Sequence, residues 1–185
     1  MRHLILVTVI LTTGGCASVQ NAFFSTEPDY AGLPVDDIEQ AATAIERAVA
    51  AGERNPQLPQ LPNLKIDTDL IEQAIRSRTA RFEMLDAFLD TGHFVEKANG
   101  LVSILRTNEY KKSTTRHQRD RNALVVMAEN EDRWTLYESL LDANDFPNRS
   151  LAAIRAIFHQ ARIQTMKKGQ KYEDSAGDIR LKESQ

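Results

Sequence analysis

The chain has 185 residues, of which 23 are Lys or Arg and 26 are Asp or Glu, so its formal net charge is −3 at pH 7. This mild acidity argues against a nucleic-acid-binding protein, which would present a concentrated basic face. A single cysteine excludes an intrachain disulfide, and the length suits one ordinary domain or a domain with a tether. We therefore expect packing, without covalent crosslinks, to stabilise the folded part.

The first 16 residues have a distinctive pattern. A polar start precedes an apolar run over residues 4–11, which is too short to span a bilayer as a helix. The sequence TGGC at residues 13–16 resembles a lipobox, although Thr13 stands where an aliphatic residue is usual. The resemblance implies cleavage after residue 15 and lipidation of Cys16. An ordinary secretory signal, which is cleaved but not lipidated, is the alternative.

The residue after the cysteine bears on the compartment. Ala17 stands where an Asp typically retains a lipoprotein in the inner membrane. In a Gram-negative cell this favours the inner leaflet of the outer membrane, with the folded part facing the periplasm. Two or more acyl chains anchor a protein stably, whereas one chain binds only marginally. We therefore expect a lipid-anchored periplasmic protein that contacts the membrane through Cys16.

Residues 16–63 are predicted to form a stalk. Residues 17–35 lack apolar periodicity, and a short helix then continues to Gly52 with a narrow, Ala-rich apolar stripe that predicts weak docking. Residues 55–62 contain three prolines, which cannot continue a helix and instead form a semi-rigid spacer. We place the domain boundary there, so that residues 64–185 form the folded domain. Whether the short helix packs on that domain stays open.

Three helices are predicted in this domain, at about residues 69–91, 116–144 and 150–168. Apolar residues recur in each of them at helical spacing. Gly92 can end the first helix as a left-handed cap, and Gly169 ends the third. A polar loop is expected between the first two helices, after a hairpin.

Two short hairpins complete the predicted domain. Asn99 and Gly100 separate the strand-like runs 93–98 and 101–106, and both residues accept the positive φ of a type I′ turn. Near the C-terminus, a turn ending at Gly177 joins two very short strand-like pieces, which could pair with the first hairpin. The predicted fold class is α+β: a small, mostly helical domain with a minor antiparallel sheet, preceded by a helical and Pro-rich tether.

Three blocks of residues carry the most specific pattern in the chain. They are GHFVE with NGL at residues 92–101, ENEDR with Tyr137 and Asn144 at residues 129–144, and GQKY with Gly177 and Lys182 at residues 169–182. Together they resemble the YdbL-like family of small periplasmic proteins, a domain of unknown function. Val95 and Ile179 depart from the family pattern. The resemblance implies a fold and a compartment but no reaction, and its members look like companions of AsmA-like lipid-transport machinery.

The block from Glu129 to Asn144 is the best candidate for a functional surface. Its polar and aromatic members are Glu129, Asn130, Asp132, Arg133, Tyr137 and Asn144. Glu129 and Arg133 are four residues apart, which predicts an exposed ion pair worth a few tenths of a kcal/mol. Asn130 interrupts an apolar stripe, so if buried it must find partners or cost about 1–3 kcal/mol. The structural interpretation is that Asn130 bonds the backbone of the hairpin or of the terminal turn, and that Asn144 caps the helix in the left-handed region. A ligand or partner site is the alternative.

No pattern in the sequence predicts catalysis or a metal site. The histidines lie singly on different elements, without metal-ligand spacing, and no cofactor is expected. Adjacent carboxylates such as Glu131 and Asp132 point in different directions on a helix, unlike the facing pair of a glycosidase. We therefore expect a non-enzymatic accessory protein of the cell envelope with an envelope protein as partner. The alternative is a binding module for lipid, peptidoglycan or another small envelope ligand.

Overall fold

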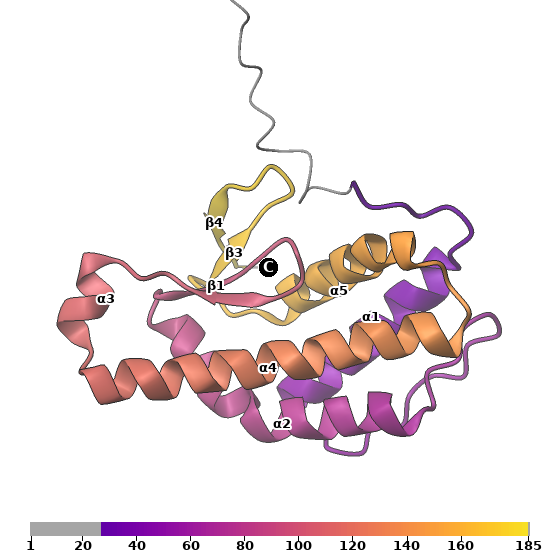
Figure 1. Cartoon of the computed structure of the whole chain (residues 1–185), viewed down its shortest axis with the longest axis horizontal. Helices are drawn as coiled ribbons and strands as arrows, with labels where there is room; N and C mark the ends of the chain where they lie inside the picture. The colour runs from indigo at the N-terminus through magenta and orange to yellow at the C-terminus, as the bar shows by residue number, and fades with distance from the viewer. Residues whose placement is uncertain (1–26, 185) are drawn as a thin grey trace, which may run out of the picture.

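The structure is a computed structural model that describes residues 27–184 (Figure 1). The signal segment and Cys16 lie outside the described residues. The fold class is α+β, as predicted. Its elements in chain order are α1 (Val35–Ala51), α2 (Asp69–Asp90), β1 (Phe94–Glu96), β2 (Val102–Ile104), α3 (Asn108–Ser113), α4 (Arg116–Ala143), the 3-10 turn η2 (Asn148–Ser150), α5 (Leu151–Thr165), β3 (Lys171–Glu173) and β4 (Ile179–Leu181). Within residues 27–184 no helix is both long and apolar enough to cross a bilayer.

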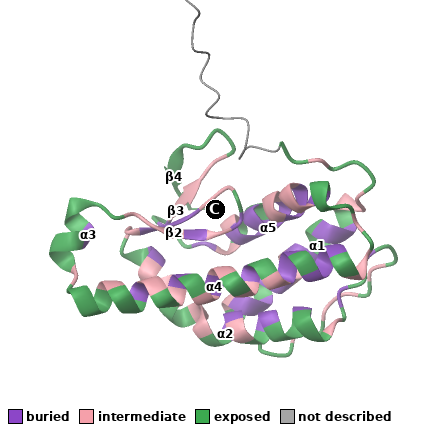
Figure 2. Ribbon diagram, in the orientation of Figure 1, coloured by how far each residue is buried: buried purple, intermediate pink, exposed green. Residues whose placement is uncertain are grey.

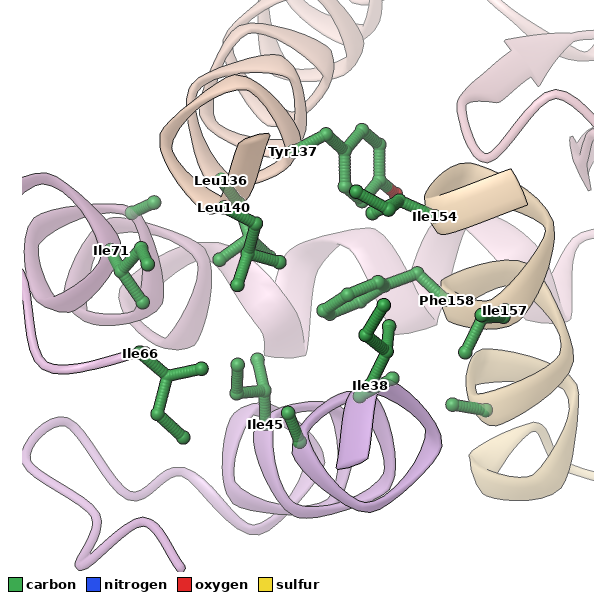
Figure 3. Packing of buried hydrophobic residues seen from close by; sticks show 14 of the residues in the cluster. Ile38, Ile45, Ile66, Ile71, Leu136, Tyr137, Leu140, Ile154, Ile157 and Phe158 are labelled. Carbon is green, nitrogen blue, oxygen red and sulfur yellow. The ribbon is translucent and has the colours of Figure 1, made fainter. Parts of the chain in front are cut away.

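Four long helices surround the main hydrophobic core (Figure 3). Helix α4 lies along α2, and α1 packs against both α5 and α2. The core residues drawn and labelled in Figure 3 come from all four helices and from the segment before α2: Ile38, Ile45, Ile66, Ile71, Leu136, Tyr137, Leu140, Ile154, Ile157 and Phe158. Figure 2 shows the same division, with buried residues on the inner sides of the helices and exposed residues outside.

Helix α1 is part of this core, which corrects the prediction that residues 36–52 belong to a weakly docked stalk. Ile38, Ala41, Ala42 and Ile45 are all fully buried. Small Ala side chains let the helix axes approach closely, so a narrow stripe can still pack densely. Burying each Ile contributes up to about 3 kcal/mol relative to leaving it exposed.

The Pro-rich segment is also tied to the domain rather than acting as a free spacer. The backbone N–H of Asn63 donates to the Asp37 carboxylate at 3.0 Å. Leu64 and Ile66, which follow the last proline, are buried in the main core. The predicted boundary between residues 63 and 64 therefore falls inside the packed unit.

The sheet is mixed, with strand order β2-β1-β3-β4. Both predicted hairpins are present, since β1 pairs with β2 and β3 with β4 in antiparallel fashion. The expectation of an antiparallel sheet is wrong at the centre, where β1 and β3 run parallel. Most of the chain between these two strands is helical, and a long helical crossover lets the second strand return in the same direction as the first.

The turns depend on glycine at the positions predicted, but with a different geometry at the first hairpin. Gly100 has φ +80°. Among the described non-glycine residues only Asp145 has a positive φ, so the φ of Asn99 is negative. The turn is therefore not type I′, which requires positive φ at both residues. Gly177 has φ +87° in the second hairpin. Gly92 has φ +70° just beyond α2, as expected of a helix-ending glycine.

Two predicted helix ends differ from the structure. Asn144 caps α4 with φ −118°, outside the left-handed region, and it is the next residue, Asp145, that has φ +53°. Helix α5 ends at Thr165, before Gly169, whose N–H instead donates to the Lys182 carbonyl at 2.8 Å. Gly169 thus begins the β3–β4 ladder. The polar loop expected after the first hairpin contains the short helix α3, whose Tyr110 is buried.

Candidate functional site

Six charged side chains form one closed network of ion pairs inside the domain. Its members are Glu46 of α1, Arg78 of α2, Glu96 of β1, Glu129 and Arg133 of α4, and Arg162 of α5. All six residues are buried, and the most exposed of them has an exposed fraction of 5 %. We call this set the buried charge ring. It joins every long helix to the sheet.

Arg78 forms one side of the buried charge ring. Its two terminal nitrogens donate to the two carboxylate oxygens of Glu46 at 3.0 and 2.8 Å, in a bidentate pair. Its Nε donates to Glu129 Oε1 at 3.0 Å. A planar guanidinium suits this arrangement because its donors form a rigid fork that matches a carboxylate. Arg78 thereby holds α1, α2 and α4 together.

Arg133 forms the opposite side. It binds Glu96 in a second bidentate pair, at 2.7 and 2.9 Å, and its Nε donates to Glu129 Oε1 at 2.7 Å. The pair between Arg133 and Glu96 fixes strand β1, and hence the sheet, to the buried face of α4. Glu129 thus accepts from both Arg78 and Arg133 and links the two halves of the ring.

Arg162 closes the buried charge ring. It donates to Glu46 Oε1 at 2.8 Å, and its Nε lies 3.0 Å from Glu96 Oε2. Its remaining nitrogen donates to the Gly100 carbonyl at 2.9 Å and to the Tyr137 hydroxyl at 3.0 Å. Tyr137 also donates to the Gly100 carbonyl at 2.9 Å. The turn of the first hairpin is therefore bound directly to the ring.

All three glutamates of the ring are ionised at neutral pH. Burial raises the pKa of Glu96, but the attraction of Arg133 and Arg162 outweighs burial and lowers this pKa to about 2. Burial also raises the pKa values of Glu46 and Glu129. The attraction of their arginine partners outweighs burial, so both pKa values lie below the ordinary value for Glu. Three carboxylates and three guanidiniums cancel in charge. Each buried ion alone would cost several kcal/mol, so a missing partner is expensive.

The ring reaches the surface through one further arginine. Arg81 donates to Glu129 Oε2 at 3.0 Å and to Asp132 Oδ2 at 2.8 Å. Both Arg81 and Asp132 are partly exposed. Asp132 therefore belongs to the outer end of the network and is not an isolated surface carboxylate.

Of the residues predicted from the Glu129 to Asn144 block, most converge on the ring and its hairpin. The expectation of an exposed Glu129–Arg133 pair is wrong, because both side chains are buried. Asn130 bonds the hairpin backbone as the structural interpretation expected, accepting from Val102 N–H at 2.9 Å and donating to the Val102 carbonyl at 3.0 Å. Asn144 lies apart at the end of α4, where it binds both backbone groups of Lys65.

Sequence reasoning missed four of the six ring members: Glu46, Arg78, Glu96 and Arg162. A signal was present, because three of them interrupt apolar helical stripes. Glu46 follows Ala42 by four residues, and Arg162 follows Phe158 by four. A charged residue on the core side of an amphipathic helix must find a partner in the core. The partners themselves lie on other elements, so spacing alone could not name them.

The outer face of α4 carries large apolar side chains. Met127 is 65 % exposed there and Trp134 is 38 % exposed. Leu124 is 66 % exposed and lies on the same side of the helix. The Arg155 guanidinium lies 4.9 Å from the centre of the Trp134 ring. We call Leu124, Met127 and Trp134 the α4 stripe.

A separate pocket lies between the Pro-rich segment and α2. It has a volume of about 200 Å³. Leu58, Ile66 and Ile75 contribute apolar lining, and Arg54 and Arg76 contribute cationic groups. Arg76 is paired with Glu72 at 3.1 Å. Among residues 27–184 there is no group of three or more side chains arranged to hold a metal ion.

Comparison with known proteins does not assign a family. No family model, curated protein or solved structure matches the chain. Three features of the described domain bear on its function: the buried charge ring, the α4 stripe and the pocket beside the Pro-rich segment.

Proposed function

We propose that this protein is a lipid-anchored accessory protein of the bacterial cell envelope, facing the periplasm, which acts by binding another envelope protein. The observation that carries the proposal is the α4 stripe. It presents three large apolar side chains, at spacings of three and seven residues, on the outer face of the longest helix. A repeat of this spacing aligns side chains along one face of a helix and suits packing against a second helix.

The charges beside the α4 stripe favour a particular kind of partner. Glu131 and Glu138 are exposed on the same side of α4. Apolar contacts would supply most of the binding free energy, whereas flanking charges would set the choice and orientation of the partner. We therefore infer that the partner presents an amphipathic segment with basic residues beside its apolar side chains.

The buried charge ring supports a binding role over a catalytic one. Its carboxylates are held by bidentate arginine contacts, and their lowered pKa values suit ion pairs rather than proton transfer near neutral pH. The ring instead makes α4 rigid and fixes the hairpin to it. A rigid helix suits a docking surface because less entropy is lost on binding.

Sequence features support the proposed compartment and the proposed anchor. The lipobox-like segment supports lipidation of Cys16, and Ala17 supports transfer to the outer membrane. The YdbL-like resemblance supports a periplasmic companion of an AsmA-like lipid-transport or assembly complex. These features direct the search for the partner to proteins of the envelope.

Site-specific photo-crosslinking in cells tests the proposed function. A photoreactive residue replacing Met127 should capture a discrete envelope protein, whereas the same residue replacing Met84 should not. Met84 is a matched control because it is also apolar and 41 % exposed, but lies on α2. Equal capture at both positions, or capture at neither, contradicts binding through the α4 stripe. Release of a Cys16→Ala variant from membranes tests the anchor separately.

The pocket beside the Pro-rich segment supports a second candidate, a binding module for a small envelope ligand. Its apolar lining and two arginines fit a short acyl chain or another small group that ends in an anion. Its volume of about 200 Å³ lies below the range typical of ligand sites. Calorimetry with octanoate and with a soluble peptidoglycan fragment tests this candidate. Heat of binding that is lost in Arg54→Ala would support it.

A further inference from the structure

The described chain begins beside the β3–β4 hairpin. Pro28 and Tyr30 line a hollow of about 420 Å³ together with Ser175 at the hairpin tip and with residues of α5. The Asp29 carboxylate pairs with Arg149 at 2.9 Å, which fastens the start of the chain to the domain. In Figure 1 the indigo start of the chain and the yellow hairpin lie on the same side of the molecule, above α5.

The length of chain before this point limits how far the domain can move from its anchor. If Cys16 carries lipid, residues 16–26 connect the bilayer to Glu27. Eleven residues reach at most about 40 Å when fully extended. Helix α4 alone, with 28 residues, is about 42 Å long. The tether therefore keeps the end of the domain with the β3–β4 hairpin within one domain length of the membrane surface.

This end of the domain carries exposed apolar side chains on an edge strand. Ile179 and Leu181 are 48 % and 57 % exposed. They alternate along β4, so both side chains lie on the same face of the sheet. Tyr30 is also exposed, and its amphipathic ring suits a membrane interface.

Two lysines lie beside these apolar side chains, in a hollow whose lining also includes Asp174 and Glu183. Lys168 and Lys182 line, together with Ile179 and Leu181, an open hollow of about 1020 Å³ between the hairpin and the end of α5. Neither lysine forms an ion pair with any residue from 27 to 184. Arg180, in contrast, is held by Asp174 and Asp178. The two lysines are therefore free to contact lipid phosphates.

We propose that the surface formed by the β3–β4 hairpin, Lys168 and Tyr30 docks on the bilayer to which Cys16 is anchored. Ile179 and Leu181 enter the boundary between headgroups and acyl chains, and Lys168 and Lys182 contact anionic headgroups. This inference rests on the proposed lipid anchor. A bilayer is favoured over a protein at this surface because the short tether holds the surface near the membrane at high effective concentration. Docking would also orient the domain with respect to the bilayer.

Fluorescence quenching of the anchored protein tests the docking. A fluorophore on the thiol of a Ser175→Cys variant reports on the hairpin, since acylation blocks Cys16. The lipidated protein is reconstituted in vesicles of phosphatidylethanolamine and phosphatidylglycerol that contain a headgroup-labelled nitroxide lipid. We expect strong quenching. Adding Ile179→Asp and Leu181→Asp should reduce the docking equilibrium constant at least about tenfold, because burial of two apolar side chains is lost.

A matched control separates docking from general effects on the fold. Leu70→Asp combined with Met84→Asp places the same two charges at apolar sites on α2 that are 55 % and 41 % exposed, and this α2 control should leave the quenching unchanged. Thermal unfolding monitored by circular dichroism checks that each variant is folded. Equal quenching in the α2 control and in the Ile179→Asp/Leu181→Asp variant overturns the proposal. So does a fluorophore that is never quenched, or a hairpin that crosslinks to a protein instead.

Failure of the anchor is distinguishable from failure of docking. If the wild-type protein fractionates away from membranes, or its Cys16 thiol is free, the lipid anchor is wrong. In that case the unlipidated chain is sedimented with the same vesicles at high lipid concentration. Binding that falls in the Ile179→Asp/Leu181→Asp variant but not in the α2 control still supports the surface, and binding that is equal in both overturns it.

Discussion

Replacement of Arg133 by Leu should destabilise the domain far more than replacement of an exposed arginine. Arg133 is fully buried and forms ion pairs with Glu96 and Glu129, both of which are also buried. Leu cannot donate to either carboxylate, so one negative charge in the ring loses its compensation. Removing one partner of a buried ion pair typically costs about 3–5 kcal/mol.

The structure also limits this loss. Glu96 keeps an ion pair with Arg162, and Glu129 keeps its contacts with Arg78 and Arg81. We therefore expect the free energy of unfolding to fall by about 3–5 kcal/mol rather than by the full cost of two orphaned carboxylates. A domain whose stability is near the upper part of the usual range of about 5–15 kcal/mol should remain folded with this substitution but unfold at much lower denaturant concentration.

Urea unfolding at pH 7, followed by circular dichroism, measures this change. Arg76→Leu is the matched control, because Arg76 forms a single, exposed ion pair with Glu72 on α2. An exposed pair of this kind contributes about 0–1 kcal/mol. If Arg133→Leu and Arg76→Leu lower the unfolding free energy by similar amounts, the buried charge ring does not hold the fold together, and the reasoning fails.

Three further predictions follow from the packing and the charges. Stability should fall as the pH decreases from about 5 to about 2, because the ring lowers the pKa of Glu96 to about 2, below its value in the unfolded chain. Acid titration of thermal stability checks this, and the stability of Glu96→Gln should depend less on pH in that window. Gly100→Ala should destabilise the domain by about 1–3 kcal/mol, and by more than Gly177→Ala. Both glycines have positive φ, but only at Gly100 would an added Cβ lie 3.2 Å from atoms of Arg155 and Tyr137. Similar melting temperatures for the two variants would contradict this. Ile45→Ala should lower the free energy of urea unfolding by about 2–5 kcal/mol because Ile45 is fully buried, whereas Leu124→Ala should lower it by about 0.5 kcal/mol or less because Leu124 is exposed. A small effect at Ile45 would show that α1 does not stabilise the core.

Local signals in the sequence predicted much of the fold. The helices at α2, α4 and α5 follow from apolar residues at helical spacing, and the hairpins follow from Gly100 and Gly177. Each of these features depends on residues close together in the chain, whose conformational preferences act before tertiary contacts form. The packing of α1 did not follow, because an Ala-rich stripe looks weak until a closely fitting partner helix is known. The parallel pairing of β1 and β3 likewise depends on the path of the chain between them.

In the candidate site, too, local sequence predicted some features and tertiary contacts decided others. The block at residues 129–144 could be selected from sequence because its polar residues fall at regular helical offsets. Its burial could not, since Glu129 and Arg133 four residues apart have the pattern of an ordinary exposed pair. What distinguishes them is the presence of Glu96 and Arg78, which are 37 and 51 residues away from their respective partners Arg133 and Glu129.

The sequence by itself determined the long helices, the two hairpins, the turn glycines, the absence of an intrachain disulfide and the expectation of a lipid anchor at Cys16, because each depends on composition or on short spacing. Only the tertiary structure decided that six charges close into a neutral ring, that α1 belongs to the core, and that the α4 stripe faces outward. The physical reason is that burial of a charge depends on compensation by partners distant in sequence. The local pattern shows where a charge lies on its helix, whereas the fold determines whether that charge meets water or an opposite charge.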